Sequence, residues 1–153
     1  MRRLLFASLI LLAACSVFRS SSEKKVINQT RTVDVIRDVG TAIEAYKLAN
    51  GTYPIGKTGH LEEIEPFLVP NFIKTLLRED GWGNEIEYYC LNPEGPYYII
   101  SLGSDKERDV GLYKTDRSPS GLGFTVIADL KEDIIFSNGL FVRYPKGARM
   151  VAS

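Results

Sequence analysis

Apolar residues recur at helical spacing in the segment 32–54. They follow one another at steps of three or four residues, which places them on one stripe of an α-helix. These positions are Val33, Ile36, Val39, Ile43 and Tyr46. Charged residues fill much of the remaining surface, with Lys47 near the end, where a helix dipole favours a cation. The pattern predicts one long amphipathic helix, with the later chain covering its apolar stripe.

The ends of this helix are predicted from its flanking residues. Asn50-Gly51 tolerates the left-handed conformation that closes a helix, and Pro54 cannot extend it. We expect the helix to begin near Val26 or Val33 and to end near Ala49.

The segment that follows the helix has shorter helical signals. Residues 51–59 are rich in turn formers and predict a loop. Residues 61–68 have apolar positions at helical spacing, but Pro66 limits them to a short helix, and 72–77 predict a further helical turn.

Strand formers dominate the second half of the chain. Residues 86–90 and 97–101 predict two strands, and 124–127 predict a weaker one. The clearest hairpin lies in 133–144, where Asn138-Gly139 separates two strand-like runs, because Asn-Gly favours a two-residue turn. The order of elements predicts an α+β fold, in which a long N-terminal helix packs on a small antiparallel β-sheet with a late β-hairpin.

The N-terminus has the composition of a bacterial lipoprotein signal peptide. Arg2 and Arg3 precede a short apolar run, 4–12, well below the about 20 apolar residues that a transmembrane helix needs. The string Leu12-Ala13-Ala14-Cys15 resembles the lipobox, in which the cysteine is lipidated and becomes the new N-terminus. An ordinary secretory signal with a chance cysteine is the alternative.

The lipobox divides the chain into three predicted parts. Residues 1–14 are the lipoprotein signal peptide, 15–25 are the lipidated Cys15 and a polar tether, and 26–150 are the folded domain. Ser16, which follows the cysteine, does not give the inner-membrane retention signal of lipoproteins. We therefore expect a lipid-anchored protein of the cell envelope that faces the periplasm or the outer surface, at the outer membrane in preference to the inner one. Several acyl chains would hold it firmly.

Charge and cysteine content narrow the class of protein. The formal net charge is zero, so no strong field favours nucleic acid. Cys90 is the only cysteine besides Cys15, and a lipid on Cys15 would leave it without an intramolecular disulfide partner. We predict that Cys90 is a buried, inert thiol, with an intermolecular bridge as the alternative.

Two sequence patterns that suggest enzyme chemistry have the wrong context. Residues 51–58 satisfy the spacing of a P-loop, but they follow a helix and not a buried strand, so we predict a turn and no nucleotide. His60 is the only histidine, and neither a Gly-x-Ser-x-Gly motif nor a zinc ligand set accompanies it. We predict a non-enzymatic protein in which His60 is a loop or cap residue.

The loop 101–109 places carboxylates among glycines and main-chain carbonyls. Asp105 and Asp109 lie four residues apart, and Asp116 follows. Calcium takes six to eight oxygen ligands, and carboxylates with carbonyls can supply them. Lys106 and Arg108 dilute the negative charge. The residues alone are compatible with a calcium site or with a solvated loop.

Three motifs together resemble the major pseudopilin of the type II secretion system. They are Asn-Gly-x-Tyr-Pro at 50–54 behind the helix end, Asp-Gly-Trp-Gly-Asn at 80–84, and the run 98–105 with Ser-x-Gly-x-Asp at its end. They occur in the order of that family over residues 31–109. The resemblance implies a soluble domain in which a long helix packs on a small antiparallel sheet.

The resemblance also implies one cofactor, calcium. Members of the family hold a calcium ion in the loop after the strand that ends near Ser-x-Gly-x-Asp. Asp105 matches the aspartate of this motif, and Asp109 and Asp116 are the further ligands that we expect.

The start of the chain differs from that of the family. Pseudopilins begin with a short basic leader, a prepilin cleavage site and a long apolar helix that packs the filament core, whereas this chain has a lipobox. We predict an envelope protein whose pseudopilin-like domain mediates protein interactions near a secretion or pilus-like machine. Its partners would be the membrane, through the lipid, and secretion components. The alternative is a structural filament or tip subunit.

Overall fold

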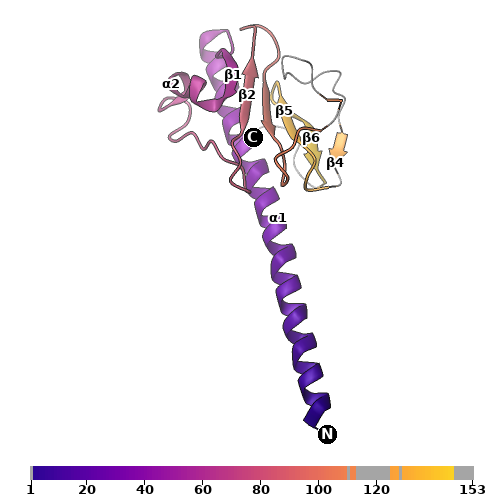
Figure 1. Ribbon diagram of the computed structural model, residues 1–153. Helices are drawn as coiled ribbons and strands as arrows, with labels where there is room; N and C mark the ends of the chain where they lie inside the picture. The colour runs from indigo at the N-terminus through magenta and orange to yellow at the C-terminus, as the bar shows by residue number, and fades with distance from the viewer. Residues whose placement is uncertain (1, 110, 113–124, 128, 147–153) are drawn as a thin grey trace.

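One long helix and a sheet beside it make up most of the described chain (Figure 1). The computed structural model describes residues 2–109, 111–112, 125–127 and 129–146. Helix α1 (Arg2–Asn50) lies against the sheet with its C-terminal part and projects from it towards the N-terminus. We call the projecting residues 2–27 the stem, and the rest of the described chain the head.

The helix begins earlier than its apolar stripe predicts. It starts at Arg2, so the predicted start near Val26 or Val33 was wrong, and the polar stretch 16–25 is helical. Residues 2–39 contain neither glycine nor proline, the two residues that interrupt helices most strongly. Residues 21–27 are exposed, and an exposed helical segment needs no apolar stripe, so hydrophobic spacing did not show that the helix continues before Val26. The division into signal peptide, tether and domain stays a prediction.

The predicted apolar stripe is confirmed as the centre of the core. Four of its members are buried, and Tyr46 packs partly buried against the same cluster. The four buried members are Val33, Ile36, Val39 and Ile43. Gly40 lies between them against the ring of Phe136, where a Cβ would come within 2.3 Å of Phe136 Cε1. A residue without a side chain therefore lets the helix approach the sheet closely.

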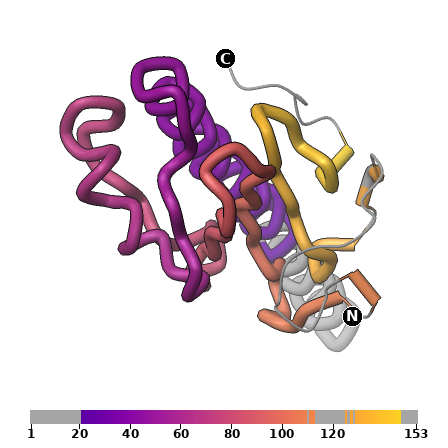
Figure 2. The backbone as a smooth tube through the Cα atoms, turned by 90° about the horizontal axis from the view of Figure 1, so that it is seen from above, coloured from indigo at the N-terminus to yellow at the C-terminus, as the bar shows by residue number. Residues whose placement is uncertain are grey.

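Six described strands form one sheet in the order β1-β2-β3-β5-β6-β4. Neighbours from β1 to β6 pair antiparallel, and β4 pairs parallel with β6. Their bounds are β1 Gly56–His60, β2 Glu87–Cys90, β3 Tyr98–Ser101, β4 Thr125–Ile127, β5 Ile134–Ser137 and β6 Leu140–Pro145. Figure 2 shows the β5–β6 hairpin on one side of α1 and the segment around α2 (Glu65–Leu68) on the other. The predicted α+β fold is confirmed.

The late hairpin is confirmed at the predicted turn. Asn138 and Gly139 have φ values of 50° and 79°, as a two-residue turn of this kind requires. The short helix predicted for 61–68 is also present, as the 3₁₀-helix η1 (Leu61–Ile64) followed by α2.

Two predictions about the connecting segments were wrong. Residues 72–77 form no helix, because Pro70 cannot donate the bond that would extend α2 and the chain turns inward to bury Leu76. Strand β1 overlaps the predicted loop 51–59 and ends one residue beyond it, at His60. Aromatic side chains pack directly against its glycines, since a Cβ on Gly56 would lie 2.5 Å from Tyr88 Cδ1. Such a strand shows no apolar alternation.

The face of the sheet turned away from the helix carries a second, smaller cluster. Tyr89, Ile100 and Ile135 form it, and Leu102 and Leu112 pack against it. The loop after β3 therefore folds back over the sheet. Among the helices of the described residues, none combines enough length and apolar character to cross a membrane.

Candidate functional site

The turn 80–84 connects the helix to the end of strand β3. Asp80 is buried, and its Oδ1 accepts hydrogen bonds from the backbone N–H groups of Trp82 and Asn84, both at 2.9 Å. Its Oδ2 accepts a 2.7 Å bond from Ser101 Oγ. The N–H of Gly81 donates to Thr32 Oγ1 of α1 at 2.9 Å. The motif at 80–84 and the motif at 98–105, which are separate in the sequence, are therefore joined by hydrogen bonds.

The segment 50–54 closes the helix over a group of tyrosines. Gly51 has a φ of 81°, and its N–H donates to Lys47 O at 2.8 Å. Glu44 Oε1 accepts bonds from the hydroxyls of Tyr97 at 2.8 Å and Tyr53 at 3.3 Å. Burial, followed by the contact with Glu44, raises the pKa of Tyr97 well above its usual range. This end of the head is therefore held by a carboxylate of the helix.

The three predicted calcium ligands do not come together in the described residues. Asp105 is exposed and accepts a bond from the N–H of Glu107 at 3.1 Å. Asp109 points instead to Arg143 of β6, with Nη2 to Oδ2 at 2.8 Å. Asp116 lies outside the described residues. No group of three or more side chains of the metal-binding types converges within the described parts of the chain.

The observed contacts of Asp109 fit a guanidinium better than calcium. Its Oδ2 already accepts from Arg143 and from the N–H of Asp133, at 3.0 Å. A cation that needs six to eight oxygens would have to displace these donors. Calcium binding stays a prediction, and it finds no support in this geometry.

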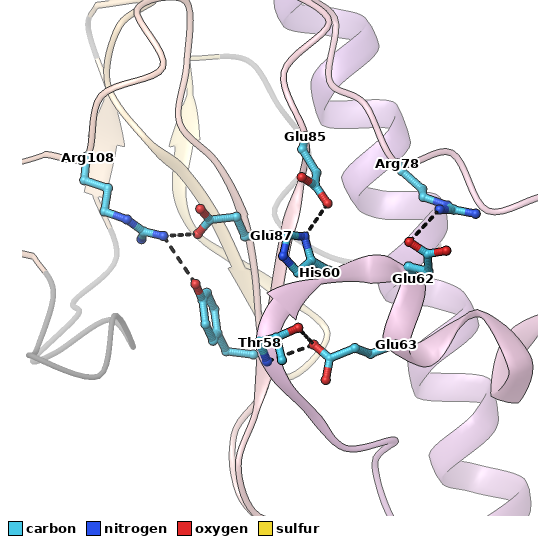
Figure 3. Close-up of polar contacts among 9 residues, drawn as sticks. Thr58, His60, Glu62, Glu63, Arg78, Glu85, Glu87 and Arg108 are labelled. Atoms are coloured by element: carbon cyan, nitrogen blue, oxygen red, sulfur yellow. Dashed lines mark hydrogen bonds and ion pairs between the residues drawn. The ribbon is translucent and has the colours of Figure 1, made fainter.

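A polar network covers the exposed edge of the sheet at β1 (Figure 3). His60 Nδ1 lies 2.7 Å from Glu85 Oε1, and this contact, together with the charge of Glu85, raises the pKa of the exposed imidazole. Glu63 accepts from both the N–H and the hydroxyl of Thr58. His60 is the last residue of β1 and occupies the N-cap position of η1, so the cap half of its prediction is confirmed, although its side chain makes no capping hydrogen bond.

The two cysteines lie in different parts of the fold. Cys90 is buried at the end of β2, where burial raises the pKa of its thiol and Sγ donates to Asn92 O at 3.2 Å. The prediction of a buried thiol is confirmed. Cys15 lies within helix α1, and its lipidation stays a prediction.

An apolar groove runs along α1 where the stem meets the head. Its volume is about 480 Å³. Val26, Ile27 and Leu77 line it and are 62%, 64% and 48% exposed. Arg31 and Asp38 stand among its polar lining residues. An exposed apolar strip with charges beside it is the surface that an amphipathic helix recognises.

Sequence reasoning missed several residues that organise these sites. Glu44 is one of the charged residues outside the apolar stripe, and no local pattern marks it, because its partners Tyr53 and Tyr97 lie outside the helix. Arg143 lies 34 residues from Asp109, so no local pattern links them. The one available signal was the charge of Arg143 within an otherwise apolar hairpin strand.

Comparison with known families agrees with the fold and the linked motifs. The model of the family described as "Type II secretion system (T2SS), protein G" matches residues 19–116. No curated protein matches the chain. The matched region contains the helix from residue 19 onward, the turn 80–84 and the loop after β3. The match covers more than half of the chain, which therefore belongs to the family of type II secretion system protein G, the major pseudopilin.

Proposed function

We propose that this protein is a non-enzymatic subunit of a type II secretion or pilus-like assembly in the cell envelope, anchored by a lipid on Cys15. The observation that carries the proposal is the exposed apolar groove at the junction of stem and head. A long helix that leaves apolar side chains uncovered has a surface to offer to other subunits.

The partner that fits this groove is a helix of a neighbouring subunit. The apolar residues Val26, Ile27 and Leu77 would contact its apolar face, and Arg31 and Asp38 would meet polar groups beside that face. Helices at such contacts lie about 8–10 Å apart. Burying these three side chains gives the contact its hydrophobic contribution.

A lipid on Cys15 would place this groove close to the membrane. Eleven residues separate Cys15 from Val26, which corresponds to about 16 Å along a helix. The head would then face the periplasm or the outer surface of the cell. The membrane that holds the anchor would be the outer membrane in preference to the inner membrane. Protein partners would reach the groove from the membrane plane.

The lipid anchor is tested by the variant Cys15→Ser. We expect the wild type to incorporate labelled fatty acid and to enter the detergent phase in phase separation. The variant should lose the label and remain in the aqueous phase. Labelling that persists in Cys15→Ser, or an unlabelled wild type, would refute the anchor.

The subunit role is tested by the variant Ile27→Asp. The charge would lie in the apolar groove, so we expect loss of the protein from sheared filaments and of cross-links between neighbouring subunits. Lys25→Asp is the matched control, because positions two apart point about 200° away from each other on a helix. Equal assembly of both variants would contradict the role of the groove.

The accessory role is the second candidate. It assigns the same groove to a secretion component and not to a second filament subunit. A wild-type protein that is cross-linked only to other secretion components, and absent from sheared filaments, would favour it.

A further inference from the structure

Arg143 lies between two loops of the head. It belongs to β6, opposite Ile135 of β5, and only 8% of its surface is exposed. Its Nη2 lies 2.8 Å from Asp109 Oδ2 and 3.1 Å from Glu132 Oε2. One guanidinium therefore contacts a carboxylate of the loop after β3 and a carboxylate of the segment before β5.

Hydrogen bonds donated by backbone N–H groups join the same two segments. The N–H of Asp109 donates to Asp133 Oδ2 at 3.1 Å, and the N–H of Asp133 donates to Asp109 Oδ2 at 3.0 Å. Ser104 N donates to Leu130 O at 2.9 Å. Asp133 is fully buried. The hydrogen bond from the N–H of Asp109 therefore offsets part of the free-energy cost of removing its carboxylate from water.

The guanidinium of Arg143 is the cation that faces the carboxylates of Asp109 and Glu132. A cation in this loop has two tasks, to neutralise carboxylates and to hold the segments 102–109 and 129–133 together. The guanidinium is always charged and presents several N–H donors in a rigid plane. It performs both tasks through the carboxylate oxygens of Asp109 and Glu132. Leu102 and Leu112 of the same loop pack on the sheet.

We propose that Arg143 takes the place of the calcium ion expected in this loop, so that the head keeps the loop closed without a metal. The proposal does not depend on the lipid anchor or on the assembly. It accounts for the contact of Asp109 with Arg143 of β6.

The first test is thermal unfolding of the full chain in EDTA and in millimolar calcium chloride. A ligand that binds only the folded state raises the melting temperature. We expect the same melting temperature in both solutions. A reproducible increase with calcium in the wild type would overturn the proposal, and this measurement requires no variant that might fail to fold.

The second test removes the guanidinium with Arg143→Gln. Without the guanidinium, the carboxylates of Asp109 and Glu132, whose side chains are 29% and 32% exposed, lose their cation. Hydrogen bonds to charged groups contribute about 1.5–3 kcal/mol, so we expect a melting temperature lower by about 5 °C. Arg78→Gln is the matched control, because Arg78 also contacts two carboxylates but its side chain is 41% exposed. The control should change the melting temperature by only about 2 °C.

Limited trypsin digestion gives the local readout. Lys106 is an exposed residue of the closed loop, and cleavage follows local opening. We expect cleavage after Lys106 to be about tenfold faster in Arg143→Gln, corresponding to one factor of ten in the opening equilibrium. Arg78→Gln should be cleaved at the wild-type rate. Equal cleavage of the two variants would overturn the proposal.

Discussion

Ser101 Oγ donates a 2.7 Å hydrogen bond to Asp80 Oδ2, across 21 residues of sequence. The other oxygen of Asp80 accepts two backbone N–H groups of its own turn. This carboxylate therefore fixes the shape of the turn 80–84 and its position against the end of β3. Because Gly81 also donates to Thr32 of the helix, the same turn ties the sheet to α1.

Replacing Asp80 should destabilise the head strongly. In Asp80→Ala, three donors lose their acceptor in a buried site, and we expect a loss of about 3 kcal/mol in the free energy of unfolding. Denaturant unfolding followed by circular dichroism measures it. Asp105→Ala is the matched control, because Asp105 is exposed and should cost under about 1 kcal/mol. A similar loss in both variants would contradict this role of Asp80.

Gly40→Ala should destabilise the protein although alanine is the better helix former. A Cβ at this position would lie 2.3 Å from the buried ring of Phe136, so the helix and strand β5 would have to separate. We expect a loss of about 1–3 kcal/mol from overpacking, although helix propensity alone predicts a gain of about 1 kcal/mol.

The control for Gly40 is Ala45→Gly on the exposed side of the same helix. It should cost about 1 kcal/mol, the ordinary propensity difference between glycine and alanine. Chemical denaturation of the three proteins gives both values. A Gly40→Ala protein more stable than wild type would show that the helix does not approach β5 as closely as the structure has it.

His60 should titrate above its ordinary pKa of 6.5, because Glu85 favours the charged imidazole. As the only histidine, it gives unambiguous ring signals in an NMR titration. Its folded pKa is raised, so its contribution to stability is fully present below the unfolded pKa and is lost as the pH rises through the folded value. Glu85→Gln should lower the pKa towards 6.5. An identical pKa in both proteins would rule out the pair in solution.

The elements that could be predicted from the sequence are those whose cause is local. The helix stripe can be predicted because buried positions recur at the helical period. The turn at Asn138-Gly139 can be predicted because few residues adopt the positive φ values that it requires. The cause of strand β1 is not local. Glycine is needed at positions 56 and 59 because the side chains of Tyr88 and Tyr89 occupy the space of a Cβ there. No pattern within β1 records this requirement.

The candidate sites divide in the same way. The three motifs of the family could be recognised, and two of them meet at Asp80 and Ser101. The pairing of Asp109 with Arg143 depends on the order of the strands, which places β6 beside β5 and the loop after β3 over it. The resemblance to the family predicted calcium, whereas the carboxylate spacing alone was compatible with a calcium site or a solvated loop, because spacing does not show which cation faces a carboxylate.

Glu44 should be coupled energetically to Tyr97. The buried hydroxyl of Tyr97 donates to Glu44 Oε1 at 2.8 Å and accepts from the N–H of Gly139 at 3.1 Å, so it links the helix to the β5–β6 turn. Hydrogen bonds to charged groups contribute about 1.5–3 kcal/mol. A double-mutant cycle with Glu44→Ala and Tyr97→Phe should give a coupling energy in this range, measured by denaturant unfolding.

The matched cycle uses Tyr53, whose hydroxyl lies at the longer distance of 3.3 Å from the same oxygen. Glu44→Ala with Tyr53→Phe should give a coupling energy below about 1 kcal/mol, because the bond is longer and Tyr53 also carries the Lys47 ammonium over its ring. If Tyr53 couples as strongly as Tyr97, the carboxylate is shared equally and the helix is not held mainly through Tyr97. Additive losses for Glu44 and Tyr97 would show that the hydroxyl finds another acceptor.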